Sequence, residues 1–138
     1  MKISTKGRYA LRMMIDIAEH GDNGWVPIKD VSKRQEISTK YLEQIVTNLT
    51  RAKLLRSGRG SGGGYMLAKT PDQYTAGEIL RAIEGDLAPV ACLKDEVNQC
   101  ERSNCCKTLG FWKGLYKLID KYVDSVTLQD FIETGKYC

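Results

Sequence analysis

The fold of this chain is decided between residues 27 and 68, which read PIKDVSKRQEISTKYLEQIVTNLTRAKLLRSGRGSGGGYMLA. Pro27 suits the first position of a helix, where its missing amide proton would have no partner, and this predicts a short helix over 28–34. Ser38 then caps a second helix that ends near Lys53, because apolar residues recur there at steps of three and four. The stretch therefore predicts two short helices joined by a tight turn.

A glycine-rich hairpin follows these two helices. Residues 54–57 and 65–68 are expected to form short strands on either side of a run of glycines. Gly58, Gly60 and Gly63 have the spacing of a dinucleotide-binding motif, but that motif needs a helix after the glycines rather than a strand. We therefore interpret the run as the tip of a β hairpin and not as a nucleotide site.

Helical patterns on both sides complete the predicted fold. Apolar residues at helical spacing predict a helix over 4–19 before the helix pair and a capped helix over 75–85 after the hairpin. Residues 87–106 lack a regular period and are expected to form a loop with a turn of helix. A long helix over 107–126 and a short capped helix over 128–133 are expected to follow.

The charge is divided unevenly along the chain. Residues 1–69 hold 13 Lys and Arg against 6 Asp and Glu, a net +7, whereas residues 70–138 hold 8 against 11, a net −3. A basic half joined to an acidic half indicates a module that binds a polyanion such as nucleic acid. No stretch is apolar for long enough to span a membrane and no signal peptide is evident, so we expect a cytoplasmic protein without membrane contact.

Together these features predict a mostly α-helical fold with a small β wing, in which a winged helix-turn-helix is joined to a long C-terminal dimerisation helix. We expect residues 1–70 to form the DNA-binding region and 71–106 to form a linking helix and a cysteine loop. Residues 107–138 are expected to form the dimerisation helix and a C-terminal tail. At 138 residues the three parts are expected to pack as one compact unit.

The second helix of the pair is expected to lie in the major groove of double-stranded DNA, because an α-helix fits there. The polar residues of its first turns are Ser38, Thr39, Lys40, Tyr41, Glu43 and Gln44. Glu43 can accept from a cytosine amino group, Gln44 can pair with adenine, and Lys40 suits guanine or phosphate. Arg59 and Ser61, in the hairpin tip, are expected to reach the DNA backbone or the minor groove. The plainer alternative is a helical hairpin with a solvated face.

Four of the five cysteines lie close together in the second half of the chain, at Cys92, Cys100, Cys105 and Cys106. In a cytosolic protein, clustered cysteines indicate metal or redox chemistry more than disulfides. Their spacing, C-x7-C-x4-C-C, differs from the C-x2-C of common zinc sites, and thiolates suit iron-sulfur clusters. We therefore expect an iron-sulfur cluster, with a zinc site, thiol redox sensing and inert thiols as alternatives.

An apolar stripe on the long helix predicts a homodimer. The members of this stripe are Leu109, Trp112, Leu115, Tyr116, Ile119, Tyr122, Val123 and Val126. The stripe is nearly heptad-like and longer than the small N-terminal half can easily cover, which favours a seam between two chains. A dimer would place two recognition helices on one face of DNA and would match a palindromic operator.

Three literal stretches resemble one family across nearly the whole chain. They are MKISTKGRYA at 1–10, STKYLEQ at 38–44 and RGSGGGY at 59–65. In these the chain resembles the IscR, CymR and NsrR family of bacterial winged-helix regulators. The resemblance implies a dimeric transcription factor whose recognition helix and Arg59 wing contact operator DNA.

The resemblance also bears on the cysteines, because family members similar to the iron-sulfur cluster regulator carry three cysteines before the long helix. It implies that a cluster, expected to be of the two-iron type, is held by Cys92, Cys100 and Cys106. The fourth ligand stays open, since Leu109 stands where the iron-sulfur cluster regulator has histidine and Arg8 stands where the nitric oxide regulator uses aspartate. The candidates are Cys105, Asp95, Glu101 and a residue of the partner chain.

We therefore expect a homodimeric DNA-binding transcription repressor that senses iron-sulfur cluster or redox status through its cysteine loop. One alternative is a cluster-free regulator of cysteine or sulfur metabolism with the same fold, acting by thiol chemistry or through a partner protein. The stretches 75–78 and 83–85 are similar to family members of that kind. A small thiol redox protein using Cys105 and Cys106 is a further alternative, but an enzyme is disfavoured because paired acid and base residues are missing.

Overall fold

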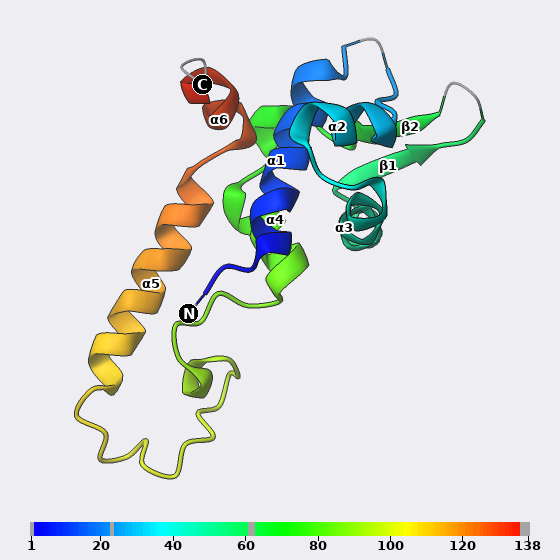
Figure 1. Cartoon of the computed structure of the whole chain (residues 1–138). Coiled ribbons are helices and arrows are strands. Elements are labelled where there is room, and N and C mark those ends of the chain that lie inside the picture. The colour runs from blue at the N-terminus through cyan, green and yellow to red at the C-terminus, as the bar shows by residue number, and fades with distance from the viewer. Residues whose placement is uncertain (1, 23, 61–62, 136–138) are drawn as a thin grey trace.

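The computed structural model describes residues 2–22, 24–60 and 63–135 and contains helices, a two-stranded hairpin and one long loop (Figure 1). Its elements are α1 (Thr5–His20), α2 (Ile28–Gln35), α3 (Thr39–Arg51), β1 (Leu55–Gly58), β2 (Gly64–Leu67), η1 (Pro71–Gln73), α4 (Ala76–Glu84), η2 (Ala91–Leu93), α5 (Leu109–Ser125) and α6 (Leu128–Thr134). The predicted mostly α-helical fold with a small β wing is confirmed. The short 3-10 helix η1 was not predicted.

The turn between α2 and α3 is made by three consecutive residues with different roles. Glu36 takes the left-handed conformation, with φ at 56°, and ends α2. Ile37 turns into the core and is 5% exposed. The Ser38 hydroxyl oxygen then accepts a hydrogen bond from the Tyr41 amide at 3.2 Å, which caps α3. The helix-turn-helix therefore lies where the sequence predicted it.

The hydrophobic core surrounds α1, which packs against α2, α3, α4, α6 and β2. Its largest fully buried apolar side chains are Met13, Met14, Ile17, Val31, Leu42, Ile45, Leu49, Ile79 and Leu128. Leu128 belongs to α6, so the chain returns to the N-terminal core after the long helix α5. The predicted cap of α6 is confirmed as a full capping box between Thr127 and Asp130.

The wing is an antiparallel hairpin, in which Leu55 pairs with Leu67 and Gly58 pairs with Gly64. Val26 extends it as a third short segment, since its amide donates to the Tyr65 carbonyl at 2.8 Å and its carbonyl accepts from the Tyr65 amide at 2.9 Å. Two glycines permit this close packing. An added Cβ would lie 2.7 Å from the Trp25 ring at Gly58 and 2.3 Å from the Val26 oxygen at Gly64.

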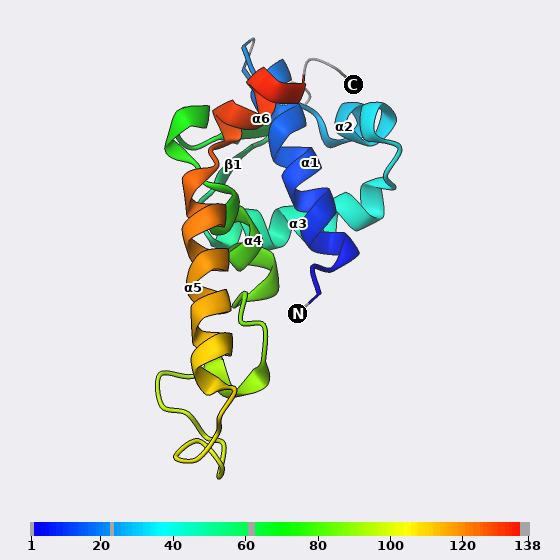
Figure 2. The ribbon, with the colours of Figure 1, turned by 90° about the vertical axis from the view of Figure 1, so that its left-hand side faces the viewer.

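Helices α4 and α5 run beside each other, and the cysteine loop that joins them lies at the far end of this pair, away from the wing (Figures 1 and 2). The Arg81 guanidinium of α4 ties the pair together by donating to Asp120 at 2.8 Å and to Asp124 at 2.7 Å. These bonds raise the pKa of Arg81, and the bond to Asp124 is the largest cause. Among the described residues, no helix is long and apolar enough to cross a membrane.

Candidate functional site

Helix α3 presents the predicted base-reading residues on its exposed side. Ser38, Thr39, Lys40, Glu43 and Gln44 are all exposed. Tyr41 differs from them, because its ring is half-buried and packs edge-on against the Tyr9 ring, with the centroids 5.7 Å apart. The Tyr41 ring therefore helps to position the start of α3, and only part of it faces solvent. Ser38 likewise serves the helix through its cap.

A network of side chains joins α1 to the end of α2. Asp16 is 1% exposed, and its carboxylate accepts from Arg34 at 2.7 Å and from the Gln35 amide at 2.9 Å. The hydrogen bond to Asp16 raises the pKa of Arg34. The Arg12 guanidinium lies 5.1 Å from the centre of the Tyr9 ring and donates to Gln35 at 3.1 Å. The network thus runs from α2 to the ring that supports Tyr41.

A hollow of about 330 Å³ lies where α1 meets the start of α3. It is lined by Thr5, Tyr9, Glu36, Ile37, Ser38 and Tyr41. The sequence prediction did not include Thr5 and Tyr9, because they lie at least 30 residues before α3 and only the packing brings them there. The hollow adds two hydroxyl groups of α1 to the surface that α3 presents.

The wing carries exposed cations on its outer part. Arg56 on β1 and Arg59 beyond it are both exposed, and Gly60 follows Arg59 with φ at 94°, a conformation that glycine adopts without strain. The predicted contact residue Ser61 lies outside the described residues. Arg59 therefore lies exposed just beyond the end of β1, and no hydrogen bond or ion pair joins it to another of the described residues, so its charge is available to a polyanion.

The cysteine loop brings three of its four thiols to one hollow of about 450 Å³. The lining residues are Cys100, Arg102, Cys105, Cys106, Lys107 and Thr108. Cys92 is not among them and lies half-buried in η2. All four cysteines of the loop are unpaired thiols. Of the predicted ligands, Cys100 and Cys106 line this hollow and Cys92 does not, while Cys105, a candidate for the fourth ligand, lines it with them.

Contacts at the start of α5 lower the pKa of the Cys106 thiol. Its sulfur lies 3.3 Å from the Thr108 hydroxyl, and this hydrogen bond is the largest cause that lowers the pKa of Cys106. The backbone amides of Thr108 and Leu109, at the start of α5, act in the same direction. A helix start stabilises negative charge. The thiolate is the form that binds iron or zinc, so the site favours metal chemistry at this residue.

The loop suits a cluster chemically but does not hold its donors in a finished cage. Within residues 2–22, 24–60 and 63–135, no three His, Cys, Asp or Glu side chains are gathered closely enough to hold one metal ion. In residues 91–107, the hydrogen bonds of the structure join positions no more than three apart in the sequence, such as the bond from the Ser103 amide to the Cys100 carbonyl. The buried amide nitrogen of Asn98 has no hydrogen-bond partner among the described residues. The hydrogen bonds of residues 91–107 are thus local turns within the loop.

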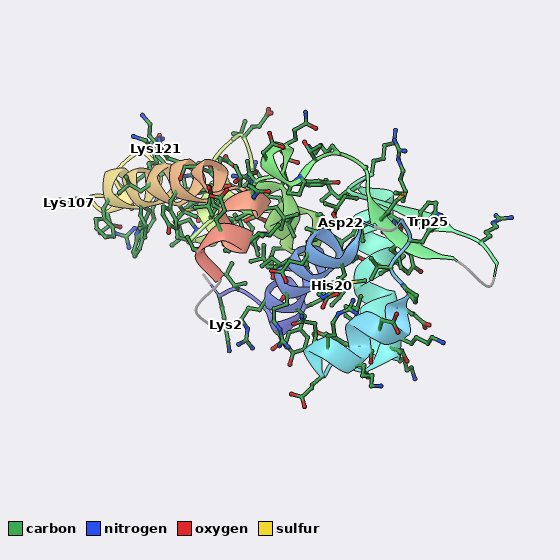
Figure 3. All side chains as sticks on the ribbon, turned by 90° about the horizontal axis from the view of Figure 1, so that it is seen from above. Lys2, His20, Asp22, Trp25, Lys107 and Lys121 are labelled. Atoms are coloured by element: carbon green, nitrogen blue, oxygen red, sulfur yellow. The ribbon has the colours of Figure 1, made fainter. Side chains whose placement is uncertain are left out.

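The long helix α5 has two apolar faces, where the sequence predicted one stripe. Trp112 and Tyr116 are half-buried, and burial followed by the charge of Asp120 raises the pKa of Tyr116. Phe111 and Leu118, which were not in the predicted stripe, are each 65% exposed, and Tyr122 is 71% exposed. The exposed face borders a groove of about 540 Å³ lined by Gly110, Phe111, Gly114, Leu115, Lys117, Leu118 and Lys121. Figure 3 shows Lys107 and Lys121 at the end of the molecule opposite to Trp25 and the wing.

The chain is similar to known proteins over nearly its whole length. The model of the Rrf2 family, described as "Iron-dependent Transcriptional regulator", matches residues 3–134. The HTH-type transcriptional regulator IscR of Aliivibrio salmonicida is 37% identical over 132 residues, which cover 96% of this chain and 77% of that protein. IscR of Yersinia pestis is 36% identical, with coverages of 96% and 79%.

Two solved structures share the fold. CymR, described as the global cysteine regulator of B. subtilis, superimposes with a TM-score of 0.79 at 36% identity, covering 97% of this chain and 98% of that one. IscR of T. potens gives a TM-score of 0.77 at 34% identity, covering 99% of this chain and 90% of that one. The two kinds of regulator are therefore about equally similar to this chain in backbone structure.

Proposed function

Because the chain belongs to the Rrf2 family of iron-dependent transcriptional regulators, we propose that it is a homodimeric repressor that responds to an iron-sulfur cluster on its cysteine loop. Membership of this family confirms a DNA-binding regulator over an enzyme or a small thiol redox protein. The observation that carries the cluster part is the single hollow shared by Cys100, Cys105 and Cys106. The regulator works in the cytoplasm, where its DNA lies.

The DNA contacts are divided between α3 and the wing. Thr39, Lys40, Glu43 and Gln44 face the base edges of the major groove, while Ser38 and Tyr41 hold the start of α3 beside the DNA backbone. Arg59, and Ser61 with it, reach the minor groove or the phosphates from the wing tip. The support for this division is the exposure of these side chains and the +7 charge of residues 1–69.

The cluster is held by Cys92, Cys100 and Cys106 together with a fourth ligand. When bound, the cluster would give the loop a group that forms only when iron is available and that oxidation can remove. The chain links this loop to the DNA-binding side through α4, because Glu84 at the end of α4 accepts from the Ser4 amide at 3.0 Å and from the Ser4 hydroxyl. Ser4 caps α1, which contributes Thr5 and Tyr9 to the hollow beside α3. A ligand on the loop can regulate DNA binding only if it binds more tightly to one arrangement of these elements than to another.

A second copy of the chain covers the exposed face of α5. Phe111, Leu118 and Tyr122 offer an apolar surface, and Gly110 and Gly114 leave open space beside it for an approaching helix. A two-fold dimer gives two recognition helices for a palindromic operator. This arrangement explains why a helix with no buried residue carries so many apolar side chains.

The DNA-binding part is tested with an operator that the native protein selects from random double-stranded DNA. Arg59→Ala should weaken operator binding about tenfold, which is about 1.4 kcal/mol, and to a similar extent on all sequences, because a contact to the DNA backbone carries no sequence information. Glu43→Ala should instead change the preferred bases. Fluorescence anisotropy measures both, with the exposed Lys113→Ala on α5 as the control. An equal loss on every sequence for the Glu43 variant would contradict its role in reading bases.

The cluster part is tested by anaerobic purification and reconstitution with iron and sulfide. We expect a coloured protein with stoichiometric iron and acid-labile sulfide, and loss of the colour in the Cys92→Ser, Cys100→Ser and Cys106→Ser variants. A colourless, iron-free protein would contradict the cluster. The likeness to CymR then favours the second candidate, a cluster-free regulator of cysteine metabolism that acts through thiol chemistry or a partner protein.

A further inference from the structure

The cysteine loop offers a cluster no nitrogen ligand. The chain has a single histidine, His20, which stands at the end of α1 with its Nδ1 2.9 Å from the Asp16 carbonyl oxygen. Leu109, the first residue of α5 after the cysteines, has a hydrocarbon side chain that cannot bind iron. The fourth ligand from this chain must therefore supply sulfur or oxygen.

Turns in the backbone bring neighbouring cysteines to the same hollow. In an extended strand, adjacent side chains point to opposite faces, which would separate Cys105 from Cys106. Here the Ser103 amide donates to the Cys100 carbonyl and the Cys105 amide donates to the Arg102 carbonyl, both at 3.0 Å. These two bonds turn the backbone back on itself, so that Cys105 and Cys106 both line the hollow with Cys100.

The lining of this hollow suits an additional thiolate better than a carboxylate. Asp95 and Glu101 are not among its lining residues, whereas Cys105 lines it beside Cys100 and Cys106. Cys92 lies outside the hollow, in η2. Arg102 and Lys107 do line it, and their positive charges offset the negative charge that a fourth thiolate brings to a cluster. Thiolates are also the ligands that iron-sulfur clusters most often use.

From this juxtaposition of Cys105 with Cys100 and Cys106 beside two cations, we infer that Cys105 is the fourth ligand, so that four thiolates of one loop hold the cluster. The inference rests on the cluster proposed above. Each protomer then holds its own cluster without a ligand from the partner subunit. Cys105 becomes a ligand of the cluster rather than an additional thiol.

The test compares Cys105→Ser and Cys105→His with the native full-length protein after anaerobic reconstitution. Electron paramagnetic resonance of the reduced cluster, its reduction potential and its loss to an iron chelator are measured. We expect Cys105→Ser to change the resonance spectrum and to lose iron about tenfold faster. Cys105→His should keep the cluster and raise its potential, because imidazole in place of thiolate raises cluster potentials. Glu101→Gln and Asp95→Asn are the matched controls and should behave as the native protein.

The outcomes separate this inference from the proposed function. A native cluster together with Cys105 variants of unchanged spectrum, potential and iron retention would show that the fourth ligand lies elsewhere, while the cluster itself stands. A changed spectrum in Glu101→Gln or Asp95→Asn alone would also overturn it. A native protein that takes up no iron would overturn both. Because Cys105 is exposed, the apo variants should melt at the native temperature, and this measurement excludes misfolding as the cause.

Discussion

Asp16 stands where the helical period of α1 would place an apolar residue. It lies one position before Ile17, and among the described residues it is the one buried charged side chain. Its carboxylate is satisfied by three donors of Arg34 and Gln35, so the burial of its charge is compensated by hydrogen bonds. The side chain joins α1 to the end of α2 and thereby sets where the turn into α3 begins.

Replacing Asp16 by Asn should therefore destabilise the protein by about 2–4 kcal/mol, because the Arg34 guanidinium loses its charged partner and the new amide donors face other donors. Urea unfolding of the cluster-free protein measures this loss. The exposed Asp22→Asn, just beyond the end of α1, is the control and should change stability little. A loss of under about 0.5 kcal/mol for the Asp16 variant would mean that the network does not hold the helix pair.

At the level of elements, the wing depends on close backbone approach more than on its own pairing. A two-stranded hairpin is marginal in water by itself. This one is held by Val26 on one edge and by Tyr74, whose hydroxyl donates to the Leu54 carbonyl at 2.7 Å and accepts from the Ala68 amide at 2.8 Å. The base of the hairpin is therefore fastened to the core on both sides.

Gly64→Ala tests this account of the wing. The new Cβ would lie 2.3 Å from the Val26 oxygen, so the hairpin must shift away from that edge. We expect a loss of about 1–3 kcal/mol in stability and weaker operator binding through a displaced Arg59. Gly135→Ala is the matched control, since a Cβ there meets nothing within 4 Å. Thermal unfolding and anisotropy measure the two effects, and unchanged values for both would contradict the packing described for the wing.

At the scale of the whole molecule, the wing and the cysteine loop lie at opposite ends (Figure 1). The side of α5 that carries Phe111, Leu118 and Tyr122 is exposed in a single chain. Exposed apolar patches of this kind mark interaction surfaces. A second copy on that face would join the two sensing loops and the two DNA-binding regions into one symmetrical body.

Leu118→Glu should convert the dimer to a monomer, because a carboxylate buried in an apolar seam has no partner. Light scattering at micromolar concentration should show the molecular mass halved, and affinity for a palindromic operator should fall further than affinity for a half-site. Lys113→Glu, also exposed on α5 but outside the groove, should remain dimeric. A Leu118 variant of undiminished mass would place the dimer seam on another surface.

Much of the fold was predictable because its signals are local. Caps at Ser38 and Thr127, the position of Pro27 and the helical periods act within one or two turns of the chain, and the structure has the elements within one or two residues of the prediction. The exposed reading face of α3 and the loop between α4 and α5 followed from the same signals. So did the identity of the thiols available for a cluster.

Tertiary structure decided how these parts meet. Ser4 donates a hydrogen bond to Glu84, which lies 80 residues away in the sequence, and no helical period or residue spacing predicts such a contact. Packing also decided which face of α5 lies against α4 and which faces solvent. The turns of the loop placed Cys100, Cys105 and Cys106 around one hollow. The physical reason is that helix periods and caps are properties of a few neighbouring residues. The choice of which face is buried depends on the shape and charge of a partner distant in sequence. The sequence by itself determined the winged helix-turn-helix and the presence of thiols in the loop before α5. Only the packing of the chain decided which helix faces and which thiols lie next to one another.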